Sequence, residues 1–232
     1  MSAAELFRRA LAIWRIQGAA GLLRRLQRRM YWKERFIRWQ LELAEFRPLA
    51  GKPASLIVRR GSLAELESLR RQLPGLPLDF YADRLYGSDR FYLGLWDEQL
   101  AHIAWVMSAA HHPSFISLEP GEVELMFVYT LRPHRGRGIQ THALNHILTD
   151  LQREPFLHAY AHVAEDNAPS LRAFVRLGFR PVATVSVRRA LGLSRIRCVP
   201  GTPPGWRLPI ARHADEAAAD RALPCPREEA RR

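Results

Sequence analysis

The stretch RPHRGRGIQTHAL, residues 132–144, decides how this chain is interpreted. It places Arg132, Arg135 and Arg137 around Gly136 and Gly138, directly before a segment of helical character. The first turn of a helix has unpaired N–H groups and a partial positive charge, and both favour an anion. The glycines let the backbone approach a ligand, and the arginines add charge-assisted hydrogen bonds. The stretch therefore predicts a turn that binds a pyrophosphate group.

The segments around this turn predict a mixed α/β domain. Before it, the apolar run VELMFVYTL (123–131) is typical of a central strand. After it we expect a helix to about residue 153, the strand FLHAYAHV (156–163), the helix APSLRAFVRLGF (168–179) and a hairpin over 182–200. Upstream we expect a strand at 55–61, a helix at 61–75 with Ser62 and Glu65 as a capping box, a short helix at 78–89 and a hairpin at 90–108.

The chain divides into three predicted segments. Residues 1–50 are interpreted as a basic, amphipathic helical extension, 54–199 as the α/β domain, and 200–232 as a disordered tail rich in Pro, Ala and charge. The helical prediction depends on two apolar stripes at helical spacing, made of Phe7, Leu11 and Trp14, and of Trp32, Phe36, Trp39, Leu43 and Phe46.

Positive charge is concentrated at the N-terminus. Of the net charge of +12, residues 1–47 supply eleven Lys/Arg against four Asp/Glu. Such an extension can lie on an anionic membrane surface, bind a protein partner or pack on its own domain. Nucleic acid is the least favoured partner, because the domain itself is not strongly basic and lacks a recognition motif.

The compartment is predicted from two absences in the sequence. No uncharged apolar run reaches the roughly 20 residues that span a bilayer, and the N-terminus is too charged for a secretory signal. We therefore expect a cytoplasmic protein, with peripheral binding at the inner face of the membrane as the alternative.

A second motif follows the turn after about thirty residues, VAEDNAPSLRAFVRLGFRPV (163–182). With both motifs, residues 54–199 resemble the GNAT superfamily of acyl-CoA-dependent N-acyltransferases. Separately, the Arg- and Ala-rich composition of the chain is typical of a high-GC bacterium. The family signature Arg/Gln-x-x-Gly-x-Gly/Ala corresponds to RGRGIQ from Arg135. The signature Asn-x-x-Ser/Ala-x-x-x-Tyr-x-x-x-Gly-Phe corresponds to Asn167, Ser170, Phe174, Gly178 and Phe179. Gln140 and Phe174 depart from these patterns, which call for Gly/Ala and Tyr.

The resemblance implies an α/β (α+β) GNAT fold, a mixed, mostly antiparallel sheet with flanking helices, preceded by the basic helical extension. It also implies acetyl-CoA as cosubstrate, no metal, and direct attack of a primary amine in a ternary complex. The residues expected to contact the cofactor are Tyr129, Thr130, Leu131, Arg132, Arg135, Gly136, Arg137, Gly138, Ile139, Gln140, Thr141, Asn167, Ser170 and Phe174.

The resemblance also implies the catalytic groups. Glu124 is the expected general base, with Glu122 on the same strand face as the substitute. Phe174 has no proton to donate to the departing thiolate. The thiolate can leave unassisted, since a thiol with a pKa of ~8.5 is a tolerable leaving group. Alternatively, Ser170 or Tyr160 donates the proton.

Several histidines are candidate site residues. His158 and His162 share a strand face with Tyr160, either lining the acceptor pocket or forming a polar outer face. His111 and His112 are not expected to bind metal, because no further ligands stand at suitable spacing.

The sequence does not choose between three acceptors: an amino sugar of polysaccharide or lipid-linked sugar assembly, a small amine, and a protein amine. The protein is expected to be a monomer or a homodimer. Two alternatives also stay open. One is a degenerate acyl-CoA-binding domain that acts as a sensor or scaffold through its basic arm. The other is aminoacyl transfer from a charged tRNA.

Overall fold

The computed structural model describes residues 31–111, 116–190 and 193–201 of the 232-residue chain. They form one eight-stranded sheet with the order β2-β3-β4-β5-β6-β1-β7-β8. Neighbouring strands are antiparallel except β5 and β6, which are parallel. The strands are β1 Tyr31–Glu42, β2 Leu56–Arg60, β3 Phe91–Trp96, β4 Gln99–Ser108, β5 Glu122–Thr130, β6 His158–Ala164, β7 Arg180–Ala190 and β8 Leu193–Pro200.

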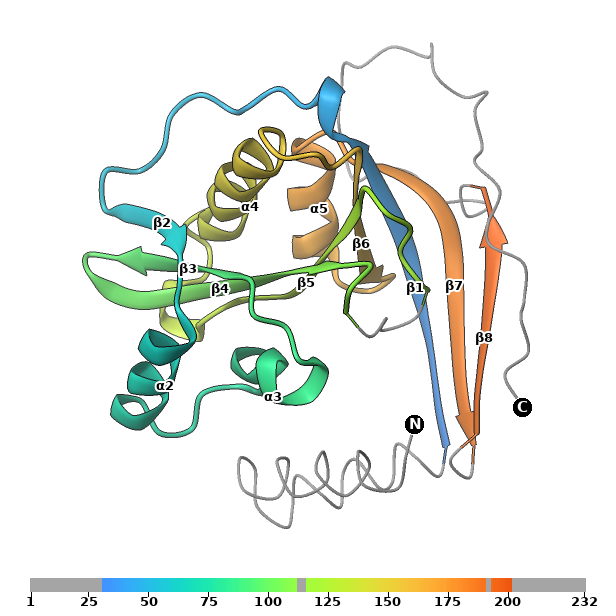
Figure 1. Ribbon diagram of the computed structural model, residues 1–232, viewed down its shortest axis with the longest axis horizontal. Helices are drawn as coiled ribbons and strands as arrows, with labels where there is room; N and C mark the ends of the chain where they lie inside the picture. The colour runs from blue at the N-terminus through green and yellow to red at the C-terminus, as the bar shows by residue number, and fades with distance from the viewer. Residues whose placement is uncertain (1–30, 112–115, 191–192, 202–232) are drawn as a thin grey trace.

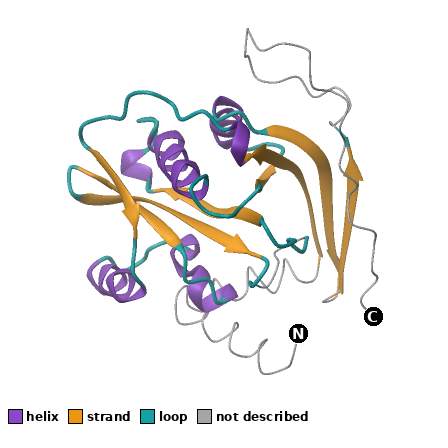
Figure 2. Cartoon of the chain, turned by 45° about the horizontal axis from the view of Figure 1, so that its top comes forward, coloured by secondary structure: helices purple, strands orange, loops and turns teal. Residues whose placement is uncertain are grey.

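Helices lie on both sides of this sheet (Figures 1 and 2). On one side are α2 (Leu63–Gln72), the 3₁₀ turn η2 (Leu78–Tyr81) and α3 (Ala82–Tyr86). On the other side are α4 (Ile139–Leu151) and α5 (Ala168–Arg176). The described residues also contain two further 3₁₀ turns, η1 (Leu43–Glu45) and η3 (Arg132–His134). The predicted mixed, mostly antiparallel sheet with flanking helices is confirmed.

The strand β1 corrects the sequence-based prediction. Residues 31–42 were expected to be helical, but they form a strand between β6 and β7, so the helical prediction is wrong there. Ile37, Trp39 and Leu41 are buried on one face with a period of two, and only Trp39 of these three also belonged to the predicted helical stripe. Pairing with two neighbouring strands outweighs that local pattern. The domain therefore begins before residue 54, while residues 1–30 and 202–232 lie outside the described part.

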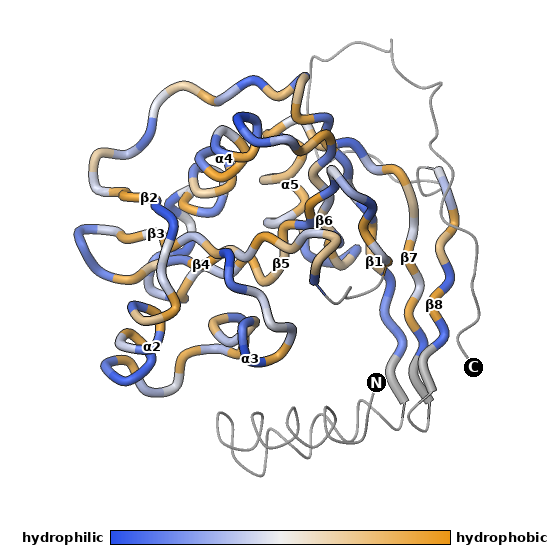
Figure 3. Tube along the Cα trace, in the orientation of Figure 1, coloured by the Kyte–Doolittle hydropathy of each residue, from blue (hydrophilic) through white to orange (hydrophobic). Residues whose placement is uncertain are grey.

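Of the three hydrophobic clusters in the described residues, the two largest hold the layers together. The larger lies between the sheet and α4 and α5, and includes Trp39, Val123, Leu144, Ala161 and Phe174. The smaller one lies under α2 and η2 and includes Leu66, Phe80, Phe91, Ile103 and Trp105. Hydrophobic residues predominate along much of β4 and β5, whereas β1, the outer loops and parts of α2 are largely hydrophilic (Figure 3).

The predicted helix start at Ser62 is confirmed. The Ser62 hydroxyl accepts a hydrogen bond from the Glu65 backbone N–H at 3.2 Å. The hydrogen bond from Arg59 Nη1, at 2.9 Å, lowers the pKa of the Glu65 carboxylate, and a hydrogen bond from the Ser62 backbone N–H lowers it further and completes the capping box. The hairpin of β3 and β4 turns at Asp97 and Glu98, both in the left-handed region with φ of 48° and 64°.

The parallel pair β5–β6 is short, and this positions the site. Only residues 122–124 of β5 pair with β6, opposite residues 158–160. Beyond them β5 has a bulge, since Trp105 of β4 pairs with Met126 and Ile103 pairs with Tyr129, which places one extra residue on β5. Phe127 within the bulge has φ of +47°, an uncommon value for a bulky residue. The second half of β5 is therefore paired with β4 but not with β6.

Candidate active site

The Arg/Gly turn joins β5 to α4 as the sequence predicts. Gly138 is the N-cap of α4 with φ of 72°, and no side chain caps this helix. Gly136 has φ of 80°, and a Cβ placed there would meet nothing within 4 Å. Both glycines are thus in a conformation that other residues adopt at a cost. The result is an exposed, uncapped helix N-terminus of the kind that binds anions.

The arginines of the turn have different surroundings. Arg135 Nε donates to the Thr130 carbonyl at 3.0 Å, and its guanidinium lies 5.1 Å from the centre of the Tyr129 ring. Arg137 lies 5.1 Å from the Trp96 ring centre, and Arg132 is exposed. Arg135 therefore secures the turn to β5, while Arg132 and Arg137 add positive charge at the surface.

Gln140 connects the two motifs. Its side-chain amide Nε2 donates to the Ser170 hydroxyl at 3.0 Å. Ser170 N–H in turn donates to Asn167 Oδ1 at 3.3 Å, which caps α5. The N-termini of α4 and α5 thus meet, and the departure from the family signature at Gln140 has a structural role. The side chains of Ile139 and Thr141 are buried, so these two positions can offer a ligand only their backbone.

Phe174, which stands where the family pattern has Tyr, belongs to the core. Its ring is buried and packs edge-on against Phe179, with centroids 5.0 Å apart and planes at 86°. Leu171 and Leu177 of the same region lie in that cluster. The side chain therefore stabilises the packing of α5 on the sheet.

A buried carboxylate–imidazole pair lies where β5 and β6 stop pairing. Glu124 Oε1 lies 2.7 Å from His162 Nδ1, and the two side chains are 2% and 3% exposed. Glu124 is the last residue of β5 in register with β6, opposite Tyr160. A carboxylate held in this way is oriented by its partner and can accept a proton, which are the requirements for a general base.

Tyr160 lies beside this pair with its proton engaged. Its hydroxyl donates to Glu122 Oε1 at 3.1 Å, and the Arg38 guanidinium carbon is 4.0 Å above its ring. Burial, together with the charge of Glu122, raises the pKa of Tyr160 far above its ordinary value. A phenol of that kind is a poor acid toward a thiolate whose conjugate thiol has a pKa of ~8.5. This surrounding disfavours Tyr160 as proton donor.

Two buried side chains near the site were missed from the sequence. Arg38 was assigned to a helical extension, and only the period of two in residues 37–41 could have placed it on a strand. His102 of β4 is fully buried, with Nδ1 2.8 Å from the Thr130 hydroxyl, and burial lowers its pKa to about 3. The neutral ring therefore holds the end of β5 directly before the turn. A lone His in an apolar strand was its only signal.

The other histidines take no part in a metal cluster within the described residues. His111 Nδ1 accepts from the Ser108 backbone N–H at 3.1 Å, and His112 lies outside the described part. The rings of His158 and Tyr160 lie 6.2 Å apart. Among residues 31–111, 116–190 and 193–201, no group of three or more potential ligands is found. In that same part of the chain, no helix is long and apolar enough to cross a membrane.

Comparison with known proteins identifies the family. The acetyltransferase (GNAT) family profile matches residues 62–179, half of the chain, from the cap of α2 to the end of the second motif. The chain belongs to this family. No curated protein sequence matches it.

Solved structures share the fold at low identity. The glucosamine N-acetyltransferase region of a fungal multi-domain GH3 β-N-acetylglucosaminidase is 12% identical, with a TM-score of 0.54 over 74% of this chain and 23% of that one. A Drosophila protein is 11% identical, with a TM-score of 0.51 over 76% and 59%. A GNAT-family acetyltransferase of Novosphingobium aromaticivorans is 18% identical, with a TM-score of 0.48 over 73% and 66%. The chain thus spans less than two thirds of the length of these relatives.

Proposed function

We propose that the protein transfers an acetyl group from acetyl-CoA to a primary amine, by direct attack of the amine in a ternary complex. One observation carries this proposal. A single strand, β5, bears the buried Glu124 where its pairing with β6 stops and then leads into the uncapped N-terminus of α4. This arrangement supports a base and an anion site along one strand, as a phosphate-bearing acyl donor and an amine acceptor require.

The donor would be held mainly by backbone groups. The exposed amides of the turn and the first turn of α4 suit the pyrophosphate, because the side chains of Ile139 and Thr141 point into the core. Arg132 and Arg137 supply charge. The second half of β5, at Tyr129 and Thr130, is not paired with β6, so it can pair with the amide-containing arm of the donor and polarise the thioester carbonyl.

Glu124 would act as the base. An acceptor amine is protonated in water and must lose a proton before it can attack. The Glu124 carboxylate takes that proton while His162 holds its orientation. The amine nitrogen then bonds to the carbonyl carbon, the carbon–sulfur bond breaks, and the thiolate leaves without an acid, taking a proton from solvent. The burial of Phe174 and the engaged proton of Tyr160 support unassisted departure, and the Ser170 hydroxyl is the remaining candidate acid.

The test has a binding arm and a turnover arm. Calorimetry with acetyl-CoA should show binding that is lost in Gly138→Val, because a β-branched residue at φ of 72° is strained and fills space over the turn. Release of free thiol, followed over a panel of amines that includes glucosamine, small alkylamines and a lysine peptide, should show turnover. Absence of acetyl-CoA binding would contradict the proposal.

A second candidate is a domain that binds acyl-CoA without chemistry. It is favoured by the core position of Phe174, which leaves the family's proton-donor position without a hydroxyl. Binding of acetyl-CoA with no thiol release on any amine of the panel would select this candidate.

We also propose a cytoplasmic location, with the basic residues before β1 as a membrane- or partner-binding arm. Deleting residues 1–47 would remove a central strand and confuse the result. Liposome flotation should therefore compare the full chain with a variant in which Arg24, Arg25, Arg28 and Arg29 are replaced by Ser. Equal flotation on anionic vesicles would argue against the membrane role.

A further inference from the structure

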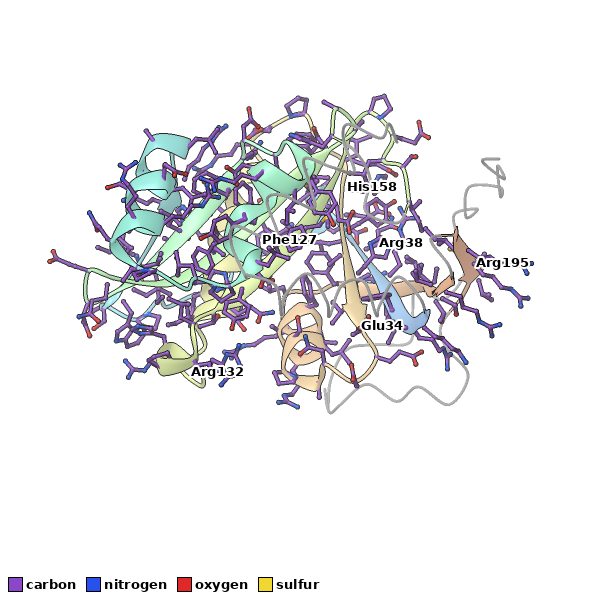
Figure 4. All side chains as sticks on the ribbon, turned by 90° about the horizontal axis from the view of Figure 1, so that it is seen from below. Glu34, Arg38, Phe127, Arg132, His158 and Arg195 are labelled. Carbon is purple, nitrogen blue, oxygen red and sulfur yellow. The ribbon has the colours of Figure 1, made fainter. Side chains whose placement is uncertain are left out.

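Arg38 is a buried arginine at the centre of the sheet. It lies on β1 opposite His162 of β6 on one side and Ala183 of β7 on the other. Only 7% of the residue is exposed. Figure 4 views the molecule from the side of α2 and α3, with Arg38 and His158 labelled on neighbouring strands and Arg132 of the Arg/Gly turn well away from both.

The contacts of Arg38 do not balance its charge. Its guanidinium stacks 4.0 Å above the Tyr160 ring. Within the described residues it makes no recorded hydrogen bond or ion pair, and its Nε atom is buried without a partner. The other buried arginine, Arg70, is fully engaged, because its Nε donates to the Phe80 carbonyl at 3.0 Å and its Nη1 donates to Asp83 at 3.0 Å. Arg70 is a structural residue, and Arg38 has a different use.

The energetics of a buried guanidinium favour an anionic ligand for Arg38. Removing a guanidinium from water costs more free energy than stacking on one aromatic ring returns. A carboxylate or phosphate accepts two parallel N–H bonds from the guanidinium fork and supplies the missing charge. A buried arginine whose fork is not occupied by the protein's own carboxylates is therefore suited to a ligand.

The position of Arg38 relative to Glu124 shows what kind of ligand fits. Glu124 contacts His162, and His162 is the cross-strand neighbour of Arg38. The strands that carry the two residues, β5 and β1, lie on either side of β6, so their backbones are two strand spacings apart, roughly 10 Å. Tyr160 lies between them on the same face, since it pairs in register with Glu124 and its ring contacts Arg38. One molecule can reach both ends only if its amine and its anionic group are several bonds apart.

We propose that Arg38 binds an anionic group, a carboxylate or a phosphate, on the amine acceptor, so that the preferred acceptor is a molecule carrying a primary amine and an anion several bonds apart. This inference rests on the proposed acetyl transfer. The strand β1 is the element that brings this positive charge next to β6 and the Glu124–His162 pair.

The test compares matched acceptors that differ only in the anion. Glucosamine is paired with glucosamine 6-phosphate, and hexylamine with 6-aminohexanoate. The wild-type protein should have a kcat/KM about 10- to 100-fold higher for the anionic member of at least one pair, as expected for a charged hydrogen-bonded contact of about 1.5–3 kcal/mol. A preference within the sugar pair alone assigns phosphate, and one within the alkyl pair alone assigns carboxylate.

Arg38→Met keeps the apolar stem and removes the charge. It should reduce the ratio of kcat/KM between anionic and neutral acceptors to about 1, mainly through KM. The matched control is Arg35→Met on the same strand, whose side chain is half exposed and pairs with Glu165 at 3.2 Å; it should leave the ratio unchanged. If Arg38→Met does not fold, Arg38→Lys is the second variant, and its preference should fall at least threefold because Lys lacks the fork.

The outcomes separate this inference from the function beneath it. Turnover of amines with no anionic preference in the wild type, or a preference that Arg38→Met retains, overturns the anion site and leaves acetyl transfer standing. No turnover of any amine overturns acetyl transfer. In that case calorimetry with glucosamine 6-phosphate and 6-aminohexanoate decides: binding that Arg38→Met abolishes supports the anion site, and no binding to the wild type overturns it.

Discussion

Replacing Glu124 by Gln tests the chemical core of the proposed function. The substitution changes one oxygen for an amide group and keeps the size of a side chain that is only 2% exposed. The amide oxygen can still accept a hydrogen bond from His162 Nδ1, which lies 2.7 Å from the carboxylate. The variant should therefore fold while losing the group that accepts the substrate's proton.

The size of the effect follows from the role. A positioned general base contributes about 10²–10⁴ in rate, so kcat/KM should fall by this factor, equivalent to about 3–5 kcal/mol of barrier. Stability should change much less, by about 1 kcal/mol, since a charged hydrogen bond becomes a neutral one. Acetyl-CoA affinity should stay within about threefold of the wild type, because the Arg/Gly turn is untouched.

Thiol-release kinetics measure kcat/KM, chemical unfolding measures the stability, and calorimetry measures the affinity for acetyl-CoA. Two glutamates serve as comparisons. Glu122→Gln should cost less than tenfold in kcat/KM, because that carboxylate already accepts the Tyr160 hydroxyl. Glu165→Gln, at a surface ion pair with Arg35, should have no effect on rate. If Glu124→Gln retained more than a third of the wild-type kcat/KM, or if Glu122→Gln were the more damaging variant, Glu124 would not be the base.

Three further predictions concern stability. Burial lowers the pKa of His102 to about 3, so below about pH 6.5 the unfolded chain takes up a proton at this residue and the native chain does not. The free energy of unfolding is therefore at its full value above that pH. It falls toward pH 3 by up to about 1.4 kcal/mol per pH unit. Urea unfolding at pH 7 and pH 5 should show a loss about 2 kcal/mol greater for the wild type than for His102→Gln, and equal losses would refute this. Trp39→Ala should cost about 3–5 kcal/mol in the same assay, against less than about 1 for Arg35→Ala on the same strand, if β1 is a central strand. Gln140→Ala should lower stability by about 1 kcal/mol through its lost bond to Ser170 and leave acetyl-CoA affinity within threefold; a large loss of affinity would show that Gln140 itself contacts the donor.

Much of the fold and part of the site could be predicted from the sequence. The helix cap at Ser62 and the turn after β5 depend on residues close together in the chain, so their local patterns are informative. The pattern over 31–46 was misleading, because apolar residues at positions 37, 39 and 41 fit a strand while those at 32, 36, 39 and 43 fit a helix. The choice between the two depends on β6 and β7, which lie more than 100 residues further along the chain.

The features of the candidate site likewise divide into those set by local sequence and those set by the tertiary structure. Arginines and glycines in seven residues are enough to make an uncapped, positively charged helix start, because backbone dihedrals and local charge determine it. The meeting of Glu124 with His162, the engaged proton of Tyr160 and the unbalanced charge of Arg38 depend on strand order and register. These are long-range properties of the sheet, since a shift of one residue in register would turn each of these side chains to the opposite face.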